Sequence, residues 1–236
     1  PAIIRICQLV GGMPLALELA AAASRHYTCA EIAAAIAQNL DFLTSSYRDT
    51  PPRQRSLRAT FDYAWAQLAP SEREMMAALS VFTGSFSQEA ARQVMASSPA
   101  LLTALVDKSL LGRMGNGRYQ LHHTLRQYAS EQLPLTRQDA LRQQHAAYFT
   151  SWLRQQESGL YTSAQMDIFQ HIIADHDNIR AAWQVALTDW QLDWLTQGLT
   201  TLRAFYNIQS RFQEGAEWLA DTAVILKSHA AQRKNS

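Results

Sequence analysis

The 236-residue sequence has few residues that break helices or form disulfides: nine glycines, seven prolines and two cysteines. This scarcity of glycine and proline, together with many alanines and leucines, argues against a glycine-punctuated all-β fold and favours helices. Cys7 and Cys29 both lie in apolar helical contexts, where small buried thiols are expected instead of a disulfide. The sequence therefore predicts a mainly α-helical protein of a reducing compartment.

An excess of charge of one sign and long apolar runs are absent as well. The formal net charge of +1 gives no reason to expect a nucleic-acid coat or a membrane-surface protein. No basic-then-apolar leader opens the sequence, and no apolar run approaches the length of a membrane-spanning helix. We expect a cytoplasmic protein that makes no membrane contact.

Three common catalytic motifs are missing. The sequence contains no Gly-x-x-x-x-Gly-Lys-Ser/Thr phosphate loop, no Gly-x-Ser-x-Gly elbow and no His-Glu-x-x-His zinc pair. The chain is still long enough for one large or two to three small domains with their own cores. We expect no catalytic residue, no metal site and no enzyme activity in this chain.

Residues 1–49 form the first predicted domain, a small helical bundle. Apolar residues from Ile3 to Val10 predict a helix that is buried on more than one side and stopped by Gly11-Gly12. Pro14 suits the first turn of the next helix, and Thr28 with Glu31 has the spacing of a capping box before a third helix. We expect the bundle to begin upstream of Pro1. Consecutive prolines at 51–52 mark the boundary.

Residues 50–134 form the second predicted domain, a winged helix. Helices are expected at 56–68, 70–82, 87–95 and 99–110. Strands expected at 110–114 and 118–122 flank a turn at Gly115-Asn116-Gly117, whose residues accept positive φ. Helices closed by one β-hairpin are typical of a winged-helix domain.

Residues 135–236 form the third predicted domain, in which paired helices are expected at 136–157, 164–187 with a break at His176, 190–208 and 211–229. Residues 204–219 resemble the helical hairpin of a tetratricopeptide array, and we expect the array to continue beyond Ser236. Five of the six tryptophans lie here. Packing between stacked helices explains them, and a peptide-binding groove is the alternative.

Six segments, taken in order, resemble the bacterial signal-transduction ATPases with numerous domains, the STAND ATPases. The likeness extends over nearly the whole chain, and the order of the segments makes it fairly specific. The segments are residues 12–17 (GMPLAL), 55–63 (RSLRATFDY), 79–82 (LSVF), 105–110 (LVDKSL), 119–122 (YQLH) and 175–183 (DHDNIRAAW).

This resemblance implies a nucleotide site shared with the rest of a larger ATPase that binds ADP or ATP with Mg²⁺. Pro14 would pack on the adenine, Gly12 would permit close approach, and His122 would reach the terminal phosphate as the histidine of a Met-His-Asp motif does. His123 replaces the aspartate of that motif. From the residues alone, helix capping also explains Gly12, Pro14 and one of the two histidines. Adjacent residues leaving a strand point to opposite faces, so the two histidines are not expected to share a metal ion.

The sequence thus predicts a non-catalytic regulatory fragment of a STAND-type ATPase that couples nucleotide state to domain rearrangement. Its partners would be other domains of the same protein and a protein bound through the helical repeats. A DNA-binding winged-helix regulator and a repeat-based interaction scaffold are the alternatives.

DNA binding by this chain is not expected, because the candidate recognition helix at 99–108 lacks the Arg, Asn and Gln side chains that read bases. The basic residues near it are expected to be solvated or to lie at domain interfaces. They are Arg53, Arg55, Arg58, Arg113 and Arg118.

Overall fold

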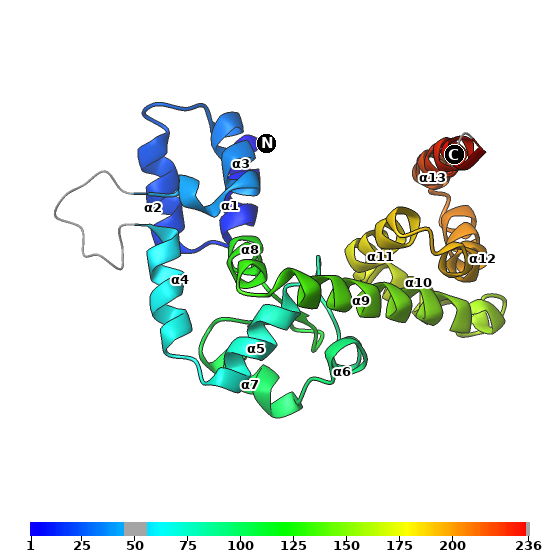
Figure 1. Cartoon of the computed structure of the whole chain (residues 1–236), viewed down its shortest axis with the longest axis horizontal. Coiled ribbons are helices and arrows are strands. Elements are labelled where there is room, and N and C mark those ends of the chain that lie inside the picture. The colour runs from blue at the N-terminus through cyan, green and yellow to red at the C-terminus, as the bar shows by residue number, and fades with distance from the viewer. Residues whose placement is uncertain (45–55, 235–236) are drawn as a thin grey trace. The chain divides into compact units, whose positions relative to one another are not determined.

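The computed structural model describes residues 1–44 and 56–234 (Figure 1). The chain divides into two compact units: unit 1 comprises Pro1–Phe82 and Ser87–Gln138, and unit 2 comprises Thr83–Phe86 and Asp139–Ser236. The predicted fold class is confirmed, because the described residues form α-helices, two short 3-10 turns and one two-stranded sheet. The three predicted domain ranges stay predictions, and the proline boundary with Arg53 and Arg55 lies outside the described residues.

Unit 1 begins with a helical bundle of α1 (Ala2–Val10), α2 (Pro14–Ala23) and α3 (Cys29–Gln38), followed by the 3-10 turn η1 (Leu40–Phe42). Its core contains Leu9, Val10, Ala16 and Ile36, and α1 packs mainly on α3. The capping box is confirmed: the Glu31 amide donates to Thr28 Oγ1 at 3.3 Å, and the Thr28 amide donates to Glu31 Oε2 at 2.8 Å.

Two expectations for α1 are wrong. Ile3 and Ile4 are 66% and 63% exposed, so only the face that carries Ile6, Leu9 and Val10 is buried. Cys7 is exposed and Cys29 is half-buried, although both thiols are free as predicted. The apolar composition of a helix indicates that it can be buried on several sides, and only the neighbouring elements decide how many sides are covered.

In the described remainder of unit 1 lie five more helices: α4 (Leu57–Ala66), α5 (Pro70–Leu79), α6 (Gln88–Met95), α7 (Pro99–Asp107) and α8 (His123–Glu131). Ser56 and Ser87 cap α4 and α6, because their hydroxyls accept the amides of Ala59 and Ala90 at 3.0 Å. These serines define the helix starts that the sequence predicted.

The hairpin of unit 1 is shorter than predicted. β1 (Gly112–Arg113) pairs antiparallel with β2 (Tyr119–Gln120), and Gly117 has φ of +77° in the turn between them. The amides of Leu110 and Leu111 instead donate back to Leu105 O at 3.0 and 3.2 Å. The end of α7 therefore uses the two residues that were expected to begin the first strand.

Unit 2 contains most of α9 (Leu135–Gln155), the turn η3 (Glu157–Gly159), α10 (Gln165–Ala174), α11 (His176–Thr188), α12 (Leu192–Ile208) and α13 (Phe212–Lys234). The predicted break at His176 is confirmed, since only Asp175 separates α10 from α11. The α12–α13 pair is closely packed, because a Cβ added at Gly215 would lie 2.8 Å from Cβ of Tyr206.

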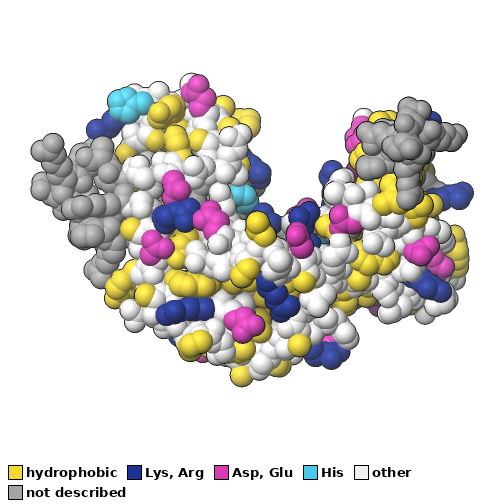
Figure 2. Space-filling model, viewed as in Figure 1, with side chains coloured by type: hydrophobic (Ala, Val, Ile, Leu, Met, Phe, Trp, Pro, Cys, Tyr) yellow, Lys and Arg dark blue, Asp and Glu magenta, His cyan; other side chains and the backbone are white. Residues whose placement is uncertain are grey.

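Aromatic packing explains two tryptophans of unit 2. Trp183 is 2% exposed, and its Nε1 donates to Thr222 Oγ1 at 2.9 Å. The ring of Trp218 makes edge contacts with Trp183, Tyr206 and His176 at centroid distances of 5.8, 5.7 and 5.8 Å. Figure 2 shows acidic and basic side chains interspersed on the face that it draws, in keeping with the near-zero net charge.

Candidate functional site

The site is built around the joint between α1 and α2, residues Gly11–Pro14. Gly11 has φ of 61° and ψ of 28°, and its amide donates to Gln8 O at 3.3 Å, while the Gly12 amide donates to Cys7 O at 3.2 Å. This pattern is a Schellman motif, which satisfies the last carbonyls of a helix and favours glycine in the left-handed position. Pro14 then begins α2, a position where the missing N–H of proline costs no intrahelical hydrogen bond.

The imidazole of His122 lies directly against Gly11. A Cβ added at Gly11 would come within 2.6 Å of Cγ and 2.8 Å of Cε1 of that ring, so no larger residue fits without movement. By contrast, no atom lies within 4 Å of a Cβ added at Gly12. The structure therefore brings the joint and His122 together, although the close approach within the chain occurs at Gly11 and not at Gly12.

The exposure of the three predicted site residues leaves room for a ligand. Gly12 and Pro14 are exposed, and His122 is half-buried. Their roles toward a nucleotide stay predictions. The sequence interpretation missed Gly11, although the Gly-Gly pair was its signal: two successive glycines allow one to contact the protein and the other to face open space.

Neither histidine side chain caps α8. His122 occupies the N-cap position, but its side chain makes no capping hydrogen bond, and His123 is the first helical residue. Nδ1 of His123 is buried without a hydrogen-bond partner in the described part of the chain. Burial, followed by the charges of Arg126 and Arg5, lowers the pKa of His123, which favours its neutral form. The capping explanation for this pair is therefore wrong.

Further contacts join the bundle of unit 1 to its second half. Arg58 on α4 forms ion pairs with Asp41 of η1 and, at 2.7 Å, with Glu131 of α8. Gln127 on α8 donates to Gln38 O at the end of α3 at 3.1 Å. Arg58 thus lies at an interface between the first two predicted domains, which is one of the two explanations offered for the basic residues.

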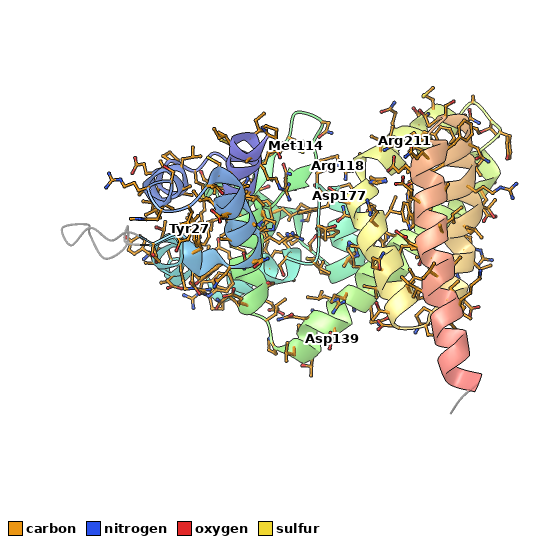
Figure 3. The ribbon with its side chains drawn as sticks, turned by 90° about the horizontal axis from the view of Figure 1, so that it is seen from above. Tyr27, Met114, Arg118, Asp139, Asp177 and Arg211 are labelled. Carbon is orange, nitrogen blue, oxygen red and sulfur yellow. The ribbon has the colours of Figure 1, made fainter. Side chains whose placement is uncertain are left out.

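Two basic residues in the described part of the predicted winged helix are paired or buried. Lys108, which follows α7, donates to both carboxylate oxygens of Glu72 at 2.7 and 2.6 Å. Arg118 is only 8% exposed, so it is not solvated, which was one of the two explanations offered, whereas Arg113 is exposed. Arg118 and Met114 lie on either side of the hairpin turn (Figure 3).

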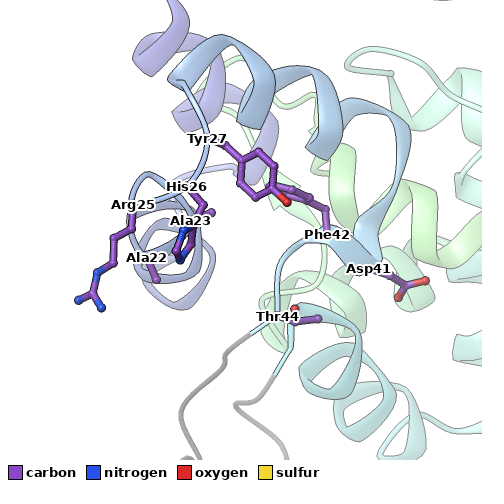
Figure 4. Close-up of a pocket in the computed structure, with 8 residues that line it drawn as sticks. All are labelled: Ala22, Ala23, Arg25, His26, Tyr27, Asp41, Phe42 and Thr44. Carbon is purple, nitrogen blue, oxygen red and sulfur yellow. The ribbon is translucent and has the colours of Figure 1, made fainter.

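Two of the cavities in unit 1 are lined by described residues, and neither lining includes Gly12, Pro14 or His122. The first, of about 440 Å³, lies between the end of α2, the α2–α3 turn and η1. Tyr27 and Phe42 meet edge-on in it at 5.4 Å, and Arg25 extends away from them (Figure 4). The second, of about 340 Å³, is lined by Trp65, Leu133 and Pro134 among others.

Across the described residues, no group of three or more His, Cys, Asp or Glu side chains is arranged to hold a metal ion. Within the same residues, no helix combines the length and the apolar composition that crossing a membrane requires.

The chain is similar over most of its length to larger proteins. It is 31% identical over 231 residues to proteins of Mycobacterium tuberculosis and Mycobacterium bovis that are provisionally named HTH-type transcriptional regulators. The match covers 92% of this chain but 26% of those relatives, so the chain spans about a quarter of their length. No protein-family model matches the chain.

Two further similarities concern a regulator and a solved structure. The chain is 33% identical over 130 residues to regulatory protein AfsR of Streptomyces coelicolor, which covers 50% of this chain and 12% of that protein. It also aligns with the crystal structure of a STAND protein with a tetratricopeptide repeat sensor from Pyrococcus horikoshii. That alignment has 15% identity and a TM-score of 0.36, and it covers 90% of this chain and 41% of the other.

Proposed function

We propose that the chain is a non-catalytic regulatory part of a STAND-type ATPase, in which the Gly11–Pro14 joint and His122 together face the nucleotide. The observation that carries this proposal is the packing of the His122 ring on Gly11, beside the open side of Gly12. Two segments whose contacting residues are 111 positions apart in the sequence thereby form one surface, as a shared ligand would require. The names of the relatives support a regulatory role for the whole protein.

The residues present fit the nucleotide. Pro14 offers an exposed apolar ring to an adenine, and the missing side chain at Gly12 leaves the backbone accessible. His122 has no capping role and is therefore available to donate to a phosphate oxygen. The phosphate loop and the Mg²⁺ ligands would come from elsewhere in the whole protein. This chain by itself supplies none of the groups that neutralise a transferring phosphoryl, so it would not hydrolyse ATP.

In this proposal the bound ADP stabilises the contact between the joint and α8, and its loss frees that contact. A ligand shifts such an equilibrium only by its difference in affinity for the two arrangements. His122 supplies that difference, because it lies at the start of α8 while Gly12 and Pro14 lie on α1–α2.

The test is the rate of ADP dissociation from the whole protein, measured for His122→Ala and for the matched variant His26→Ala, which removes an exposed histidine of the α2–α3 turn. A charge-assisted hydrogen bond contributes roughly 1.5–3 kcal/mol, so H122A should release ADP about 10- to 100-fold faster. H26A should be unchanged. Equal rates in H122A and the parent protein would overturn the proposal. The isolated chain should bind ADP more weakly than micromolar in calorimetry.

A DNA-binding role is the second candidate, favoured by the HTH-type name of the mycobacterial relatives. The paired Lys108 and buried Arg118 argue against direct DNA binding by this chain. A sequence-selective shift of duplex DNA by the isolated chain, weakened by salt, would establish this alternative. We expect no shift.

The proposal also includes a protein partner bound through unit 2. The supporting observation is that three apolar side chains on α13 are exposed: Phe212, Leu219 and Val224 are 59%, 38% and 66% exposed. Phe212→Ser and Val224→Ser in the whole protein should weaken partner capture without changing ADP dissociation. Capture at the parental level by this double variant would exclude these two side chains from the partner surface.

A further inference from the structure

A short segment of the chain is bound in unit 2 although the residues on both sides of it belong to unit 1. This segment, Thr83–Phe86, follows α5 and precedes α6. It lies against the junction of α10 and α11, where the Ser85 hydroxyl contacts Ala174 O at 3.5 Å. These contacts lie within unit 2, and the nucleotide proposal does not use them.

Asn178 on α11 makes most of these contacts and is fully buried. Its Oδ1 accepts the Thr83 amide at 3.0 Å and lies 3.5 Å from both the Gly84 amide and the Thr83 hydroxyl. Its Nδ2 donates to Ser85 O at 2.8 Å and to Asp175 Oδ1 at 3.4 Å. A single side-chain amide thus forms hydrogen bonds with both a donor and an acceptor of the segment's backbone.

The surroundings of Asn178 fit this segment closely. His145 of α9 lies on the other side, with Nε2 at 3.5 Å from Asn178 Oδ1, and is 2% exposed. A Cβ added at Gly84 would lie 3.1 Å from Cβ and 3.2 Å from Oδ2 of Asp177, which Figure 3 places on α11. Phe86 is fully buried. The site therefore fits a small residue at position 84 and an aromatic residue at position 86.

We propose that unit 2 contains a peptide-binding site whose ligand is the chain's own Thr83–Phe86 segment, and that Asn178 is the residue that recognises it. The site holds the connection between α5 and α6, and it does so without any nucleotide. This inference therefore goes beyond the proposed function and does not depend on it.

The chemistry distinguishes recognition from ordinary core packing. A leucine at 178 would fill a similar volume, but it would leave the Thr83 amide and the Ser85 carbonyl without their partner. Leaving a buried donor or acceptor unsatisfied costs more than the net gain from forming the bond. The amide of Asn178 instead matches both a donor and an acceptor in the backbone of one particular segment.

The test is hydrogen exchange of the intact 236-residue chain, compared between the parent, Asn178→Ala and the control Asn207→Ala, which removes an exposed asparagine of α12. In N178A, the amides of Thr83 and Gly84 should exchange at least about 10-fold faster, the factor expected for one lost hydrogen bond. Peptides from α5 and α8 should keep their parental rates. N207A should match the parent throughout.

Two milder variants keep the proposal testable if N178A does not fold. Asn178→Asp retains the acceptor but loses the donor to Ser85 O, and Gly84→Ala disturbs the fit at Asp177 from the side of the segment. Each should raise exchange at residues 83–86 and leave α5 unaffected. Parental exchange at these residues in N178D and G84A, or an equal rise throughout unit 2, would overturn the proposal.

Discussion

The His122 contact in unit 1 and the Asn178 contact in unit 2 both join segments that are distant in the sequence, but they use their polar groups in opposite ways. His122 packs by shape on Gly11, makes no capping hydrogen bond, and is followed by a histidine whose Nδ1 is buried without a partner. Asn178 is fully buried, and both ends of its amide are hydrogen-bonded.

This difference separates a contact that is open to a ligand from one that is already complete. Buried polar groups are normally satisfied, so the unpaired Nδ1 of His123 is an exception among the described residues. In the proposed function, a nucleotide completes the contact in unit 1 through His122. In unit 2 the segment itself is the ligand, and no further group is required.

The largest expected effect concerns the contact between Gly11 and His122. Gly11→Ala should lower the free energy of unfolding of the chain by about 3 kcal/mol, since it combines a left-handed alanine with overlap on the His122 ring. Gly12→Ala, which has the same sign of φ and no neighbour, should cost only about 1 kcal/mol. Urea denaturation measures both. Equal costs would show that the packing on His122 contributes nothing to stability.

The next effect concerns the surroundings of Asn178, which His145 contacts, and it appears as a pH dependence of stability. Burial lowers the pKa of His145 to about 4, against an ordinary value of 6.5. As the pH falls below 6.5, the unfolded chain takes up a proton that the folded chain does not, so stability is constant above 6.5 and falls toward pH 4. The loss should reach up to about 3 kcal/mol.

The measurement is urea unfolding between pH 7 and pH 4.5, followed by tryptophan fluorescence, for the parent and for His145→Gln. The variant should lose most of the pH dependence in this range. A slope that is unchanged in H145Q would assign the acid sensitivity to other groups.

The smallest effect concerns Arg58, which joins α4 to η1 and to the end of α8. Arg58→Ala should lower the stability of unit 1 by about 1 kcal/mol, because two partly exposed ion pairs across an interface are lost. The matched variant Arg92→Ala breaks an exposed pair with Glu89 within one helix and should change stability by less than about 0.5 kcal/mol. Differential scanning calorimetry compares the two. A larger loss in R92A would contradict the assigned role of Arg58.

Local signals in the sequence predicted the elements well. Thr28 and the two serines before α4 and α6 act within one turn of themselves, and Pro14 and the break at His176 need only their own helices. Contacts with distant segments escaped prediction. The burial of Arg118, the exposure of Ile3 and Cys7, and the shortened first strand each depend on neighbours that the local pattern does not specify.

The candidate site shows the same division. The resemblance indicated Gly12, Pro14 and His122, but the choice between Gly11 and Gly12 as the contact point requires the position of the histidine ring. Asn178 meets Thr83 across 95 residues of sequence, so its neighbours Asp175 and Asp177 gave only the signal of a helix start.

Hydrogen exchange of the whole protein with and without ADP tests the central claim most directly. If the first contact is nucleotide-responsive and the second is complete, ADP should slow exchange in the 9–17 and 119–125 peptides together and leave residues 83–86 unchanged. Protection of only one of the first two peptides, or of neither, would contradict the account.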